Sequence, residues 1–285
     1  MAVFAERPIR ILHVIASLSE RTGGPAKAAF DMARAVAKRG HRVAIYTTDR
    51  AMEPDSARRL DEPIERDGVE IRVFREHFPR AFATSLPLMR ALASAIPQAD
   101  VVHLHSLYLF HVWAAARLCK RHGVPYLLRP HGTLDPYLWQ RHRWRKRVLE
   151  ILFQDRVIRG AAALHYTAEE EMALAAPHAH GAKGVVIPNG LDLADYPDVP
   201  RGRFRAQYPE IGDRRIVLFL GRLNFKKGLD LLVPAFARAL EHHGDLHLVI
   251  AGPDDGMRGQ TERWVDEAGI RARTTFTDML KHMPK

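Results

Sequence analysis

The fold is decided by the stretch Ile216-Val217-Leu218-Phe219-Leu220-Gly221-Arg222-Leu223-Asn224-Phe225-Lys226-Lys227-Gly228. It opens with a five-residue apolar run, which predicts a strand buried on both faces of a parallel sheet. The run ends at Gly221, and a helical pattern of apolar residues begins after Gly228. Residues 222–228 are therefore predicted to form a loop at the carboxyl end of a strand, where open α/β sheets bind ligands.

Two cations in this loop suit phosphate oxygens. The guanidinium of Arg222 is a planar fork that can bond two oxygens at once, and the ammonium of Lys227 is a compact point charge. The helix predicted after Gly228 adds unpaired N–H groups and the positive end of its dipole. The loop is therefore predicted to bind a diphosphate; the alternative is a basic loop that only faces solvent.

The start of the chain has the order of a dinucleotide-type α/β unit. A strand is predicted over 9–15, a loop over 17–27, then a helix and a second strand over 43–46. Gly23 and Gly24 lie in the loop, where the absence of a Cβ lets the backbone approach a ligand closely. A plain tight turn is the alternative. Further strands are predicted at 69–74, 100–105, 124–129, 161–166, 185–187, 246–252 and 273–277.

Length and composition favour two globular domains. The chain has 285 residues, more than the roughly 100–200 of a typical single domain, and its hydrophobic content of 47% argues against disorder. Cys119 is the only cysteine, which excludes an intrachain disulfide and suits a reducing compartment. No apolar run reaches the roughly 18–20 residues that span a bilayer, and the N-terminus lacks a signal-peptide pattern. A cytoplasmic protein is predicted, either soluble or attached peripherally to the inner face of the plasma membrane.

The net charge of +10 and the isoelectric point near 10.0 favour anionic partners. Nucleotide sugars, anionic lipids and nucleic acids all qualify on charge alone. The sequence has no zinc-finger ligand spacing, aromatic RNA-binding signature or basic-zipper pattern, so no nucleic-acid partner is predicted. For the adjacent acids Asp254 and Asp255, a turn with capping acids is favoured over a metal site. No metal is predicted.

Two segments carry a resemblance to a known family. Phe219-Leu220-Gly221-Arg222-Leu223 with Lys227-Gly228 resembles the donor-phosphate loop of the retaining GT-B glycosyltransferases of family 4. Pro188-Asn189-Gly190-Leu191-Asp192 resembles the segment where the first domain of these enzymes passes into the second. The resemblance implies an α/β, GT-B-like fold of two Rossmann-like, doubly wound parallel-sheet domains. The acceptor-side domain is assigned to residues 1–193 and the nucleotide-sugar domain to residues 194–285.

The resemblance also implies site residues at strand ends. His131, in Pro130-His131-Gly132-Thr133, matches a cleft histidine that meets the donor sugar, and the alternative is a structural strand-end histidine. Gly23 and Gly24 match a loop beside the donor phosphate and the acceptor. His105 is a further cleft candidate, with a packed histidine as an equal alternative.

The segment that joins the domains supplies further candidates. Asn189 and Gly190 are expected at the cleft floor in left-handed backbone, which the Asn-Gly pair favours. Asp192 is expected to cap a helix, with a role as a cleft carboxylate as the alternative.

A basic and aromatic run covers 139–147. If it is helical, Arg143 and Arg147 share a face, with Trp139 and Trp144 nearby. Tryptophan beside arginine suits the headgroup level of an anionic membrane or a lipid-linked acceptor. A solvated helix face is the equal alternative.

Members of the family continue with further α/β units that carry a Glu-x7-Glu motif, and no such motif follows Lys285. The second domain is therefore expected to be incomplete through C-terminal truncation. In a doubly wound sheet the first strand is central, so the strand at 216–220 is expected to have one unpaired edge and bare apolar faces.

The predicted function is that of a retaining glycosyltransferase. It would move a sugar from a nucleotide-diphospho-sugar, a co-substrate rather than a cofactor, to a saccharide or lipid-linked acceptor, in assembly of surface polysaccharide, lipopolysaccharide or glycolipid. Arg222 and Lys227 would neutralise the leaving diphosphate. The alternatives are an inactive remnant or binding module and a sugar-nucleotide epimerase. The sequence does not select the nucleotide, the sugar or the acceptor.

Overall fold

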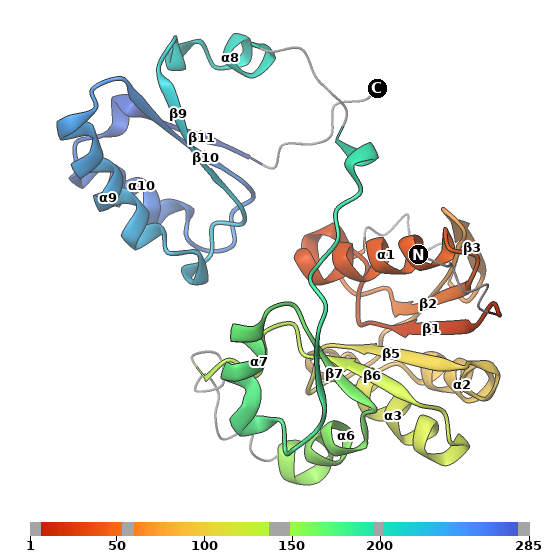
Figure 1. Ribbon diagram of the computed structural model, residues 1–285. Coiled ribbons are helices and arrows are strands. Elements are labelled where there is room, and N and C mark those ends of the chain that lie inside the picture. Colours follow the sequence, from red (N-terminus) through yellow and green to blue (C-terminus); the bar gives the residue numbers. More distant parts are fainter. Residues whose placement is uncertain (1–6, 53–59, 137–148, 197–201, 279–285) are drawn as a thin grey trace, which may run out of the picture. The chain divides into compact units, whose positions relative to one another are not determined.

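The computed structural model describes residues 7–52, 60–136, 149–196 and 202–278. The chain divides into two compact units, Met1–Asp195 (unit 1) and Tyr196–Lys285 (unit 2). Both units are layered α/β structures built on a sheet of mainly parallel strands (Figure 1). Among the described residues, no helix combines the length and the apolar character that crossing a membrane requires.

The sheet of unit 1 has eight strands within the described residues, in the order β3-β4-β2-β1-β5-β6-β7-β8. All neighbours are parallel except β3, which runs antiparallel to β4 at one edge. The strands are β1 (Arg10–Val14), β2 (Arg42–Thr48), β3 (Pro63–Arg66), β4 (Val69–Phe74), β5 (Val101–His105), β6 (Tyr126–Arg129), β7 (Ala163–Tyr166) and β8 (Gly184–Val186).

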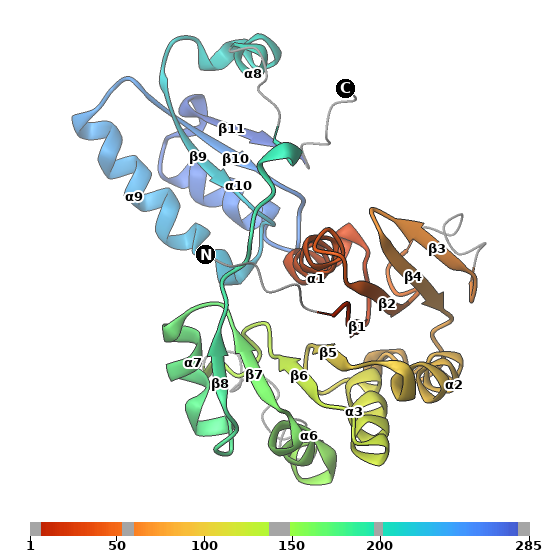
Figure 2. The same ribbon diagram turned by 45° about the vertical axis from the view of Figure 1, so that its right-hand side comes forward.

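Helices cover both faces of this sheet, as Figures 1 and 2 show. On one face α1 packs Ala29 and Ala33 against Val43 and Ile45. On the other face a larger apolar core contains residues of α2, α3 and α6. Among the described residues of unit 1, the longer helices are α1 (Gly24–Ala37), α2 (Leu86–Ala95), α3 (Phe110–His122), the π-helical turn η5 (Glu150–Gln154), α6 (Asp155–Gly160) and α7 (Glu169–Ala175).

Alternation along the central strands separates apolar from polar side chains. Val102 and Leu104 of β5 point into the larger core, so His103 and His105 point to the opposite face, on which α1 packs. His13 of β1 lies directly beside His103 in the parallel register. Polar residues of neighbouring strands therefore share one face of the sheet.

Two expectations for unit 1 differ from the structure. The helix predicted to follow a loop over 17–27 begins at Gly24, because Pro25 suits the first turn of a helix. The strands expected from the sequence do not include β3, because its sequence Pro-Ile-Glu-Arg has few apolar residues. This edge strand is exposed at most of its positions.

Unit 2 has three parallel strands within the described residues, in the order β11-β10-β9. This is the order that the doubly wound fold predicts for its first three strands. Its elements are α8 (Arg203–Gln207), β9 (Arg215–Leu220), α9 (Leu229–His242), β10 (Leu246–Ala251), α10 (Arg258–Glu267) and β11 (Thr274–Thr277).

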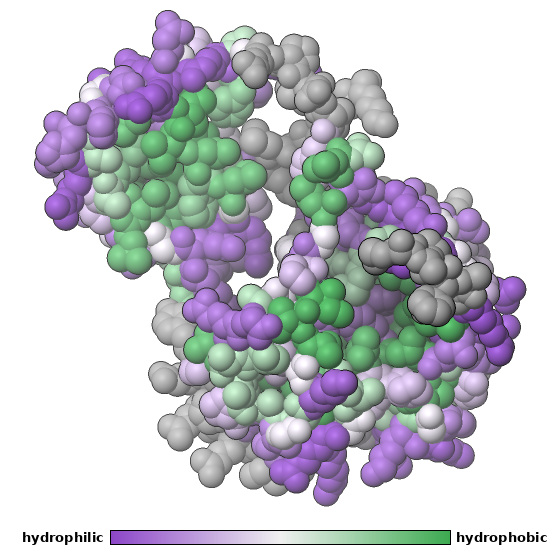
Figure 3. Space-filling view, in the orientation of Figure 1, coloured by the Kyte–Doolittle hydropathy of each residue, from purple (hydrophilic) through white to green (hydrophobic). Residues whose placement is uncertain are grey.

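The strand β9 is paired on one side only within the described residues, while β10 is buried along its whole length. Leu218 and Leu220 are 56% and 71% exposed, and Figure 3 shows apolar side chains gathered over this part of unit 2. The interpretation of 216–220 as a strand buried on both faces is therefore wrong for this structure. The expected unpaired edge and bare apolar surface are present.

Candidate functional site

The carboxyl ends of the unit 1 strands bring the predicted site residues to one edge of the sheet. His131 follows β6 and is half-buried, with its Nε2 3.1 Å from Nδ1 of His105. His105 has no exposed surface, and its Nε2 lies 3.0 Å from Nδ1 of His13. His105 therefore lies behind His131, where it orients that ring without reaching solvent.

Burial keeps the imidazole of His131 neutral. Burial and the nearby guanidinium of Arg129 together lower the pKa of His131 to about 4, with Glu171 opposing part of the effect. A neutral imidazole carries one N–H and one lone pair, so His131 can offer either a donor or an acceptor to a sugar hydroxyl.

Backbone strain gathers at this edge. Ser106 and Tyr108 after β5, and His131 after β6, have φ angles of 75°, 60° and 54°. Non-glycine residues rarely adopt the left-handed region, and such residues persist where the surroundings hold them, commonly at binding sites. Loops after neighbouring strands are thus held in set conformations next to His131.

Glu171 of α7 joins the loop after β6 to the loop after β7. One carboxylate oxygen accepts from the backbone N–H of Gly132 at 2.9 Å, and the other accepts from the backbone N–H and the hydroxyl of Thr167, both at 2.7 Å. Burial opposes ionisation, but the bonds from Thr167 and Gly132 and the charge of Arg129 lower the pKa of Glu171 overall. Glu171 was not among the site residues predicted from the sequence.

Arg129, at the end of β6, is a buried cation that the sequence analysis also missed. Its side chain is 2% exposed, and Nη2 donates to Oδ1 of Asn189 at 2.6 Å. Nε and Nη1 have no hydrogen-bond partner within the described residues. Burial lowers the pKa of this guanidinium, and the charge of Glu171 offsets part of the effect.

The prediction of left-handed backbone at Asn189 and Gly190 is wrong. Neither residue is among the described residues with positive φ, and the segment has no regular secondary structure. The Asn189 side chain serves instead as a hydrogen-bond acceptor for Arg129, so no tight turn is required there.

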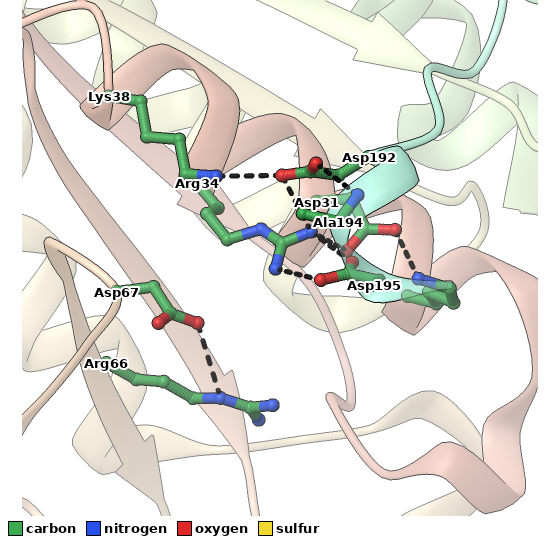
Figure 4. A network of polar contacts seen from close by, with 9 residues as sticks. Asp31, Arg34, Lys38, Arg66, Asp67, Asp192, Ala194 and Asp195 are labelled. Atoms are coloured by element: carbon green, nitrogen blue, oxygen red, sulfur yellow. Dashed lines mark hydrogen bonds and ion pairs between the residues drawn. The ribbon is translucent and has the colours of Figure 1, made fainter. Parts of the chain in front are cut away.

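Figure 4 shows how the segment after β8 is fixed to α1. Arg34 of α1 makes a two-pronged ion pair with Asp195, with Nη1 and Oδ1 3.0 Å apart, and this bond lowers the pKa of Asp195. Lys38 bonds Asp192 at 2.7 Å. Asp192 also accepts from the backbone N–H of Ala194 at 3.1 Å, so the capping role favoured by the sequence is the observed one. A separate ion pair in the same view joins Arg66 and Asp67 at 3.9 Å.

Gly23 and Gly24 form the N-terminus of α1. Gly23 has φ 83°, a left-handed value that favours glycine, and no side chain caps the helix. A Cβ added to Gly24 would meet no atom within 4 Å. The first turn of a 14-residue helix therefore presents backbone N–H groups at a place with open space, which suits an anion.

A pocket of about 340 Å³ in unit 1 lies beside the loops that follow β6 and β7. Its wall includes Gly132, Leu134, Tyr166, Glu171 and Leu174. The hydroxyl of Tyr166 is buried and has no partner within the described residues. An apolar wall with a few polar groups is typical of small-molecule sites of this volume.

In unit 2 the predicted phosphate loop follows β9. Arg222 forms an ion pair with Asp255, with Nη1 and Oδ2 3.1 Å apart, and Asn224 donates to the same oxygen at 2.9 Å. Lys227 is exposed, and no ion pair is found for it in the described part of the chain. Gly228 (φ 67°) begins α9, which has no side-chain cap. Two cations and a helix N-terminus thus lie at the carboxyl end of β9.

The backbone holds this loop in place. Leu223 donates its N–H to the carbonyl of Pro253 at 3.0 Å, and Asp255 donates to the carbonyl of Leu223 at 3.1 Å. A Cβ on Gly252 would lie 1.9 Å from the carbonyl oxygen of Gly221. Only glycine allows the loops after β9 and β10 to approach this closely.

Of the two acids after β10, Asp254 has the capping role that the sequence predicted, whereas Asp255 pairs with Arg222. One carboxylate oxygen of Asp254 accepts from the backbone N–H groups of Gly256, Met257 and Arg258 at 2.9 to 3.1 Å, and so caps α10. The predicted membrane or acceptor patch, Trp139, Arg143, Trp144 and Arg147, lies outside the described residues.

Family models match both parts of the chain. Residues 22–195 match the model of Glycosyltransferase Family 4, and residues 200–283 match that of Glycosyl transferases group 1. The chain belongs to Glycosyltransferase Family 4. The loop at 221–228 and the strand-end histidine at 131 therefore lie within a glycosyltransferase of the family that the resemblance suggested.

Curated relatives agree with this assignment. The chain is 26% identical over 277 residues to a GDP-mannose:cellobiosyl-diphosphopolyprenol alpha-mannosyltransferase of Xanthomonas campestris, covering 94% of this chain and 67% of the relative. It is 26% identical over 268 residues to a D-inositol 3-phosphate glycosyltransferase of Actinosynnema mirum, covering 88% of this chain and 63% of the relative. The chain thus spans about two thirds of the length of these relatives.

Solved structures confirm the predicted α/β, GT-B-like fold. HepE of Anabaena in complex with UDP and glucose superimposes with a TM-score of 0.68 at 17% identity, over 95% of this chain and 69% of that one. Sucrose-phosphate synthase of Thermosynechococcus elongatus gives a TM-score of 0.69 at 20% identity, over 97% and 71%. At these identities the likeness concerns the fold alone.

Proposed function

We propose that this protein transfers a sugar from a nucleotide-diphospho-sugar to a saccharide or lipid-linked acceptor, with retention of configuration. The observation that carries the proposal is the loop at 221–228, where Arg222, Lys227 and the uncapped N-terminus of α9 meet at the carboxyl end of β9. These groups offer positive charge where a diphosphate leaving group gains negative charge. HepE, of similar fold, was solved with UDP-glucose, which is consistent with such a donor.

The unit 1 groups divide the remaining roles between them. The N-terminus of α1 has no side-chain cap and has open space at Gly24, so its backbone N–H groups would bind an anion. His131, kept neutral by burial, would hydrogen-bond the transferred sugar, with its ring held by His105. The transfer step needs no cofactor in this scheme, because fixed cations and helix N-termini supply the charge. Retention follows from the resemblance to family 4 and not from the geometry described here.

The acceptor side of the proposal follows the relatives. The printed name of the Xanthomonas enzyme describes mannosyl transfer to a diphosphopolyprenol-linked saccharide. For this chain we extend that to a lipid-linked or free saccharide acceptor in assembly of surface polysaccharide or glycolipid. The basic run at 139–147 would place the protein at the cytoplasmic face of an anionic membrane.

The decisive experiment combines binding and turnover. The chain is titrated by calorimetry with UDP, GDP and their sugar conjugates, and release of nucleoside diphosphate is followed with added saccharide acceptors. Arg222→Ala should weaken nucleotide binding by roughly 1.5–3 kcal/mol, the range for hydrogen bonds to charged groups. Arg238→Ala is the control, because Arg238 is an exposed arginine further along α9. Unchanged affinity in Arg222→Ala would remove the loop from the site.

A second candidate is a module that binds nucleotide sugars without turnover. Within the described residues, β9 pairs with a neighbouring strand on one side only and exposes Leu218 and Leu220. The predicted phosphate loop therefore has a neighbouring strand on one side only, which favours this candidate. Binding without release of nucleoside diphosphate, for every acceptor tried, would support this candidate over the transferase.

A further inference from the structure

Three buried histidines meet on the α1 face of the unit 1 sheet. His13 lies on β1, and His103 and His105 lie two residues apart on the neighbouring strand β5. Their exposed fractions are 1%, 4% and 0%. One ring nitrogen of each lies within 4.8 Å of those of the other two. Side chains alternate between the two faces along β5, so both of its imidazoles point to one face, and the parallel strand β1 supplies the third imidazole, that of His13.

The hydrogen bonds show which nitrogens carry lone pairs. Nε2 of His165 lies 2.9 Å from the carbonyl oxygen of Ile187, which can only accept, so this nitrogen carries the proton. Nδ1 of neutral His165 must then accept from Nε2 of His103, 3.3 Å away. A neutral His103 carries one proton, and this hydrogen bond places that proton on Nε2. Its Nδ1 therefore holds a lone pair.

The other two imidazoles can present lone pairs to the same place. Nδ1 of His105 faces Nε2 of His131 at 3.1 Å, and when it donates there, Nε2 of His105 is left as a lone pair. That nitrogen lies 3.0 Å from Nδ1 of His13, which donates to it in the metal-free chain, so His13 binds a metal through Nδ1 only after its proton moves to Nε2. A neutral imidazole whose second nitrogen is held by an outer partner is the arrangement in which histidine binds metal.

We infer that His13, His103 and His105 form a binding site for a late first-row divalent cation of the zinc class. Imidazole suits zinc far better than magnesium or calcium, and three histidines with one open position are a known zinc ligand set. Tetrahedral zinc with Zn–N bonds of about 2.0–2.1 Å separates its nitrogens by about 3.3 Å. Binding therefore requires the widest pair of nitrogens, now within 4.8 Å, to close.

The charges around the cluster set the class of ion. The Arg129 guanidinium lies close enough to lower the pKa of both His103 and His105, so it repels a bound cation. Glu171 lies beside Arg129 and opposes part of that charge. No carboxylate belongs to the cluster of described residues that could hold an ion, so a cation that relies on oxygen ligands gains nothing here. The inference departs from the expectation from sequence that the chain holds no metal.

Metal binding at this site would also fix the ring of His131. Coordination of Nε2 of His105 leaves the proton on its Nδ1, which then donates to Nε2 of His131. His131 consequently presents Nδ1–H, a donor, as its remaining group. The inference does not depend on sugar transfer, since the cluster is defined by unit 1 side chains alone.

The test uses the full chain, stripped of metal with a chelator and titrated with Co²⁺ and Zn²⁺. The expected result is one equivalent of Co²⁺ with the intense visible absorption of four-coordinate cobalt, displaced by Zn²⁺. His13→Gln and His103→Gln should lose this absorption. His165→Asn removes an outer partner and should lower the affinity by roughly 10–100-fold. His247→Gln should keep full binding, because His247 is an equally buried histidine of unit 2, 1% exposed.

Two results would overturn the inference. One is the absence of a four-coordinate cobalt spectrum in the wild-type chain. The other is an unchanged spectrum in His103→Gln, which would assign the ion to surface histidines. If the glutamine variants do not fold by circular dichroism, imidazole ¹⁵N spectra of the wild-type chain decide. Zn²⁺ must then shift the signals of three buried histidines and leave that of His247 unmoved.

Discussion

The carboxyl edges of the two sheets are built in different ways. In unit 1, His131, Arg129 and Glu171 are buried or half-buried, and they are held by hydrogen bonds to His105, Asn189 and Gly132, respectively. In unit 2, Arg222 and Lys227 are exposed, and the loop that carries them is fixed by backbone bonds to the loop after β10. Hydrogen bonds made by side chains therefore set the geometry of the unit 1 edge, and hydrogen bonds between backbone segments set that of the unit 2 edge.

This difference determines which substitutions matter. A network of charged and neutral hydrogen bonds fails when one member loses its hydrogen-bonding capacity. Hydrogen bonds between two backbone segments are lost only when an added side-chain atom enters the space between the segments. Exposed cations contribute little to stability and act mainly on ligands. Each prediction below separates one of these effects from the others.

The largest effect is expected from Gly252→Ala in unit 2. Its φ of 149° and a Cβ placed 1.9 Å from the carbonyl oxygen of Gly221 force the two loops apart, with a cost of about 3 kcal/mol or more. Hydrogen-exchange mass spectrometry on peptides from 215–278 reads unit 2 separately from unit 1. The control is Gly259→Ala in α10, where a Cβ meets nothing within 4 Å, and stability should stay level or rise by up to about 1 kcal/mol. Equal effects of the two substitutions would contradict the close approach as the reason for glycine.

A smaller effect is expected from Glu171→Gln in unit 1. Glutamine keeps one acceptor oxygen, so the bonds to Gly132 and Thr167 cannot all remain, and the stability of unit 1 should fall by about 2 kcal/mol. Glu169→Gln is the control, because Glu169 is exposed on the same helix. Urea unfolding at pH 7 measures both variants.

The pH dependence of this loss has a defined sign. The native pKa of Glu171 is lowered below its ordinary value of 4.5, so its contribution is present above that value and disappears as pH falls through the native pKa. The gap between wild type and Glu171→Gln should therefore be widest near neutral pH and close in acid. A gap that widens in acid would mean that the carboxylate does not hold the loops.

The order of the three strands of unit 2 and the places of the ligand loops could be predicted from the sequence. Apolar runs ending in Gly221, His105 and Arg129 locate strand ends, and parallel topology places those ends at common edges. The helix start at Gly24 was missed because it depends on Pro25 in the first turn of α1. The strand β3 was missed because it depends on pairing at the edge of the sheet.

The side-chain networks could not be predicted in full, for physical reasons. Alternation along Val102-His103-Leu104-His105 does place both histidines on one face, so two of the three histidines of the buried cluster were open to inference. The partner His13 depends on the parallel register, and Glu171 and Arg129 depend on how α7 and the segment after β8 pack. Such contacts between distant parts of the chain leave no local pattern.

The smallest effect concerns the cation pair of unit 2. Asp255 bonds Arg222 at 3.1 Å and so competes with a phosphate for the same guanidinium. Both side chains are exposed by more than a third, 43% and 39%, so the pair is worth about 0.5 kcal/mol and Asp255→Asn should tighten nucleoside diphosphate binding roughly two-fold. The gain should shrink at high salt, since an exposed pair is screened. Asp266→Asn, at the far end of α10, should leave the affinity unchanged. Weaker binding in Asp255→Asn would mean that this carboxylate holds Arg222 in its binding position, and the exposed edge of unit 2 would then be preorganised by side chains as unit 1 is.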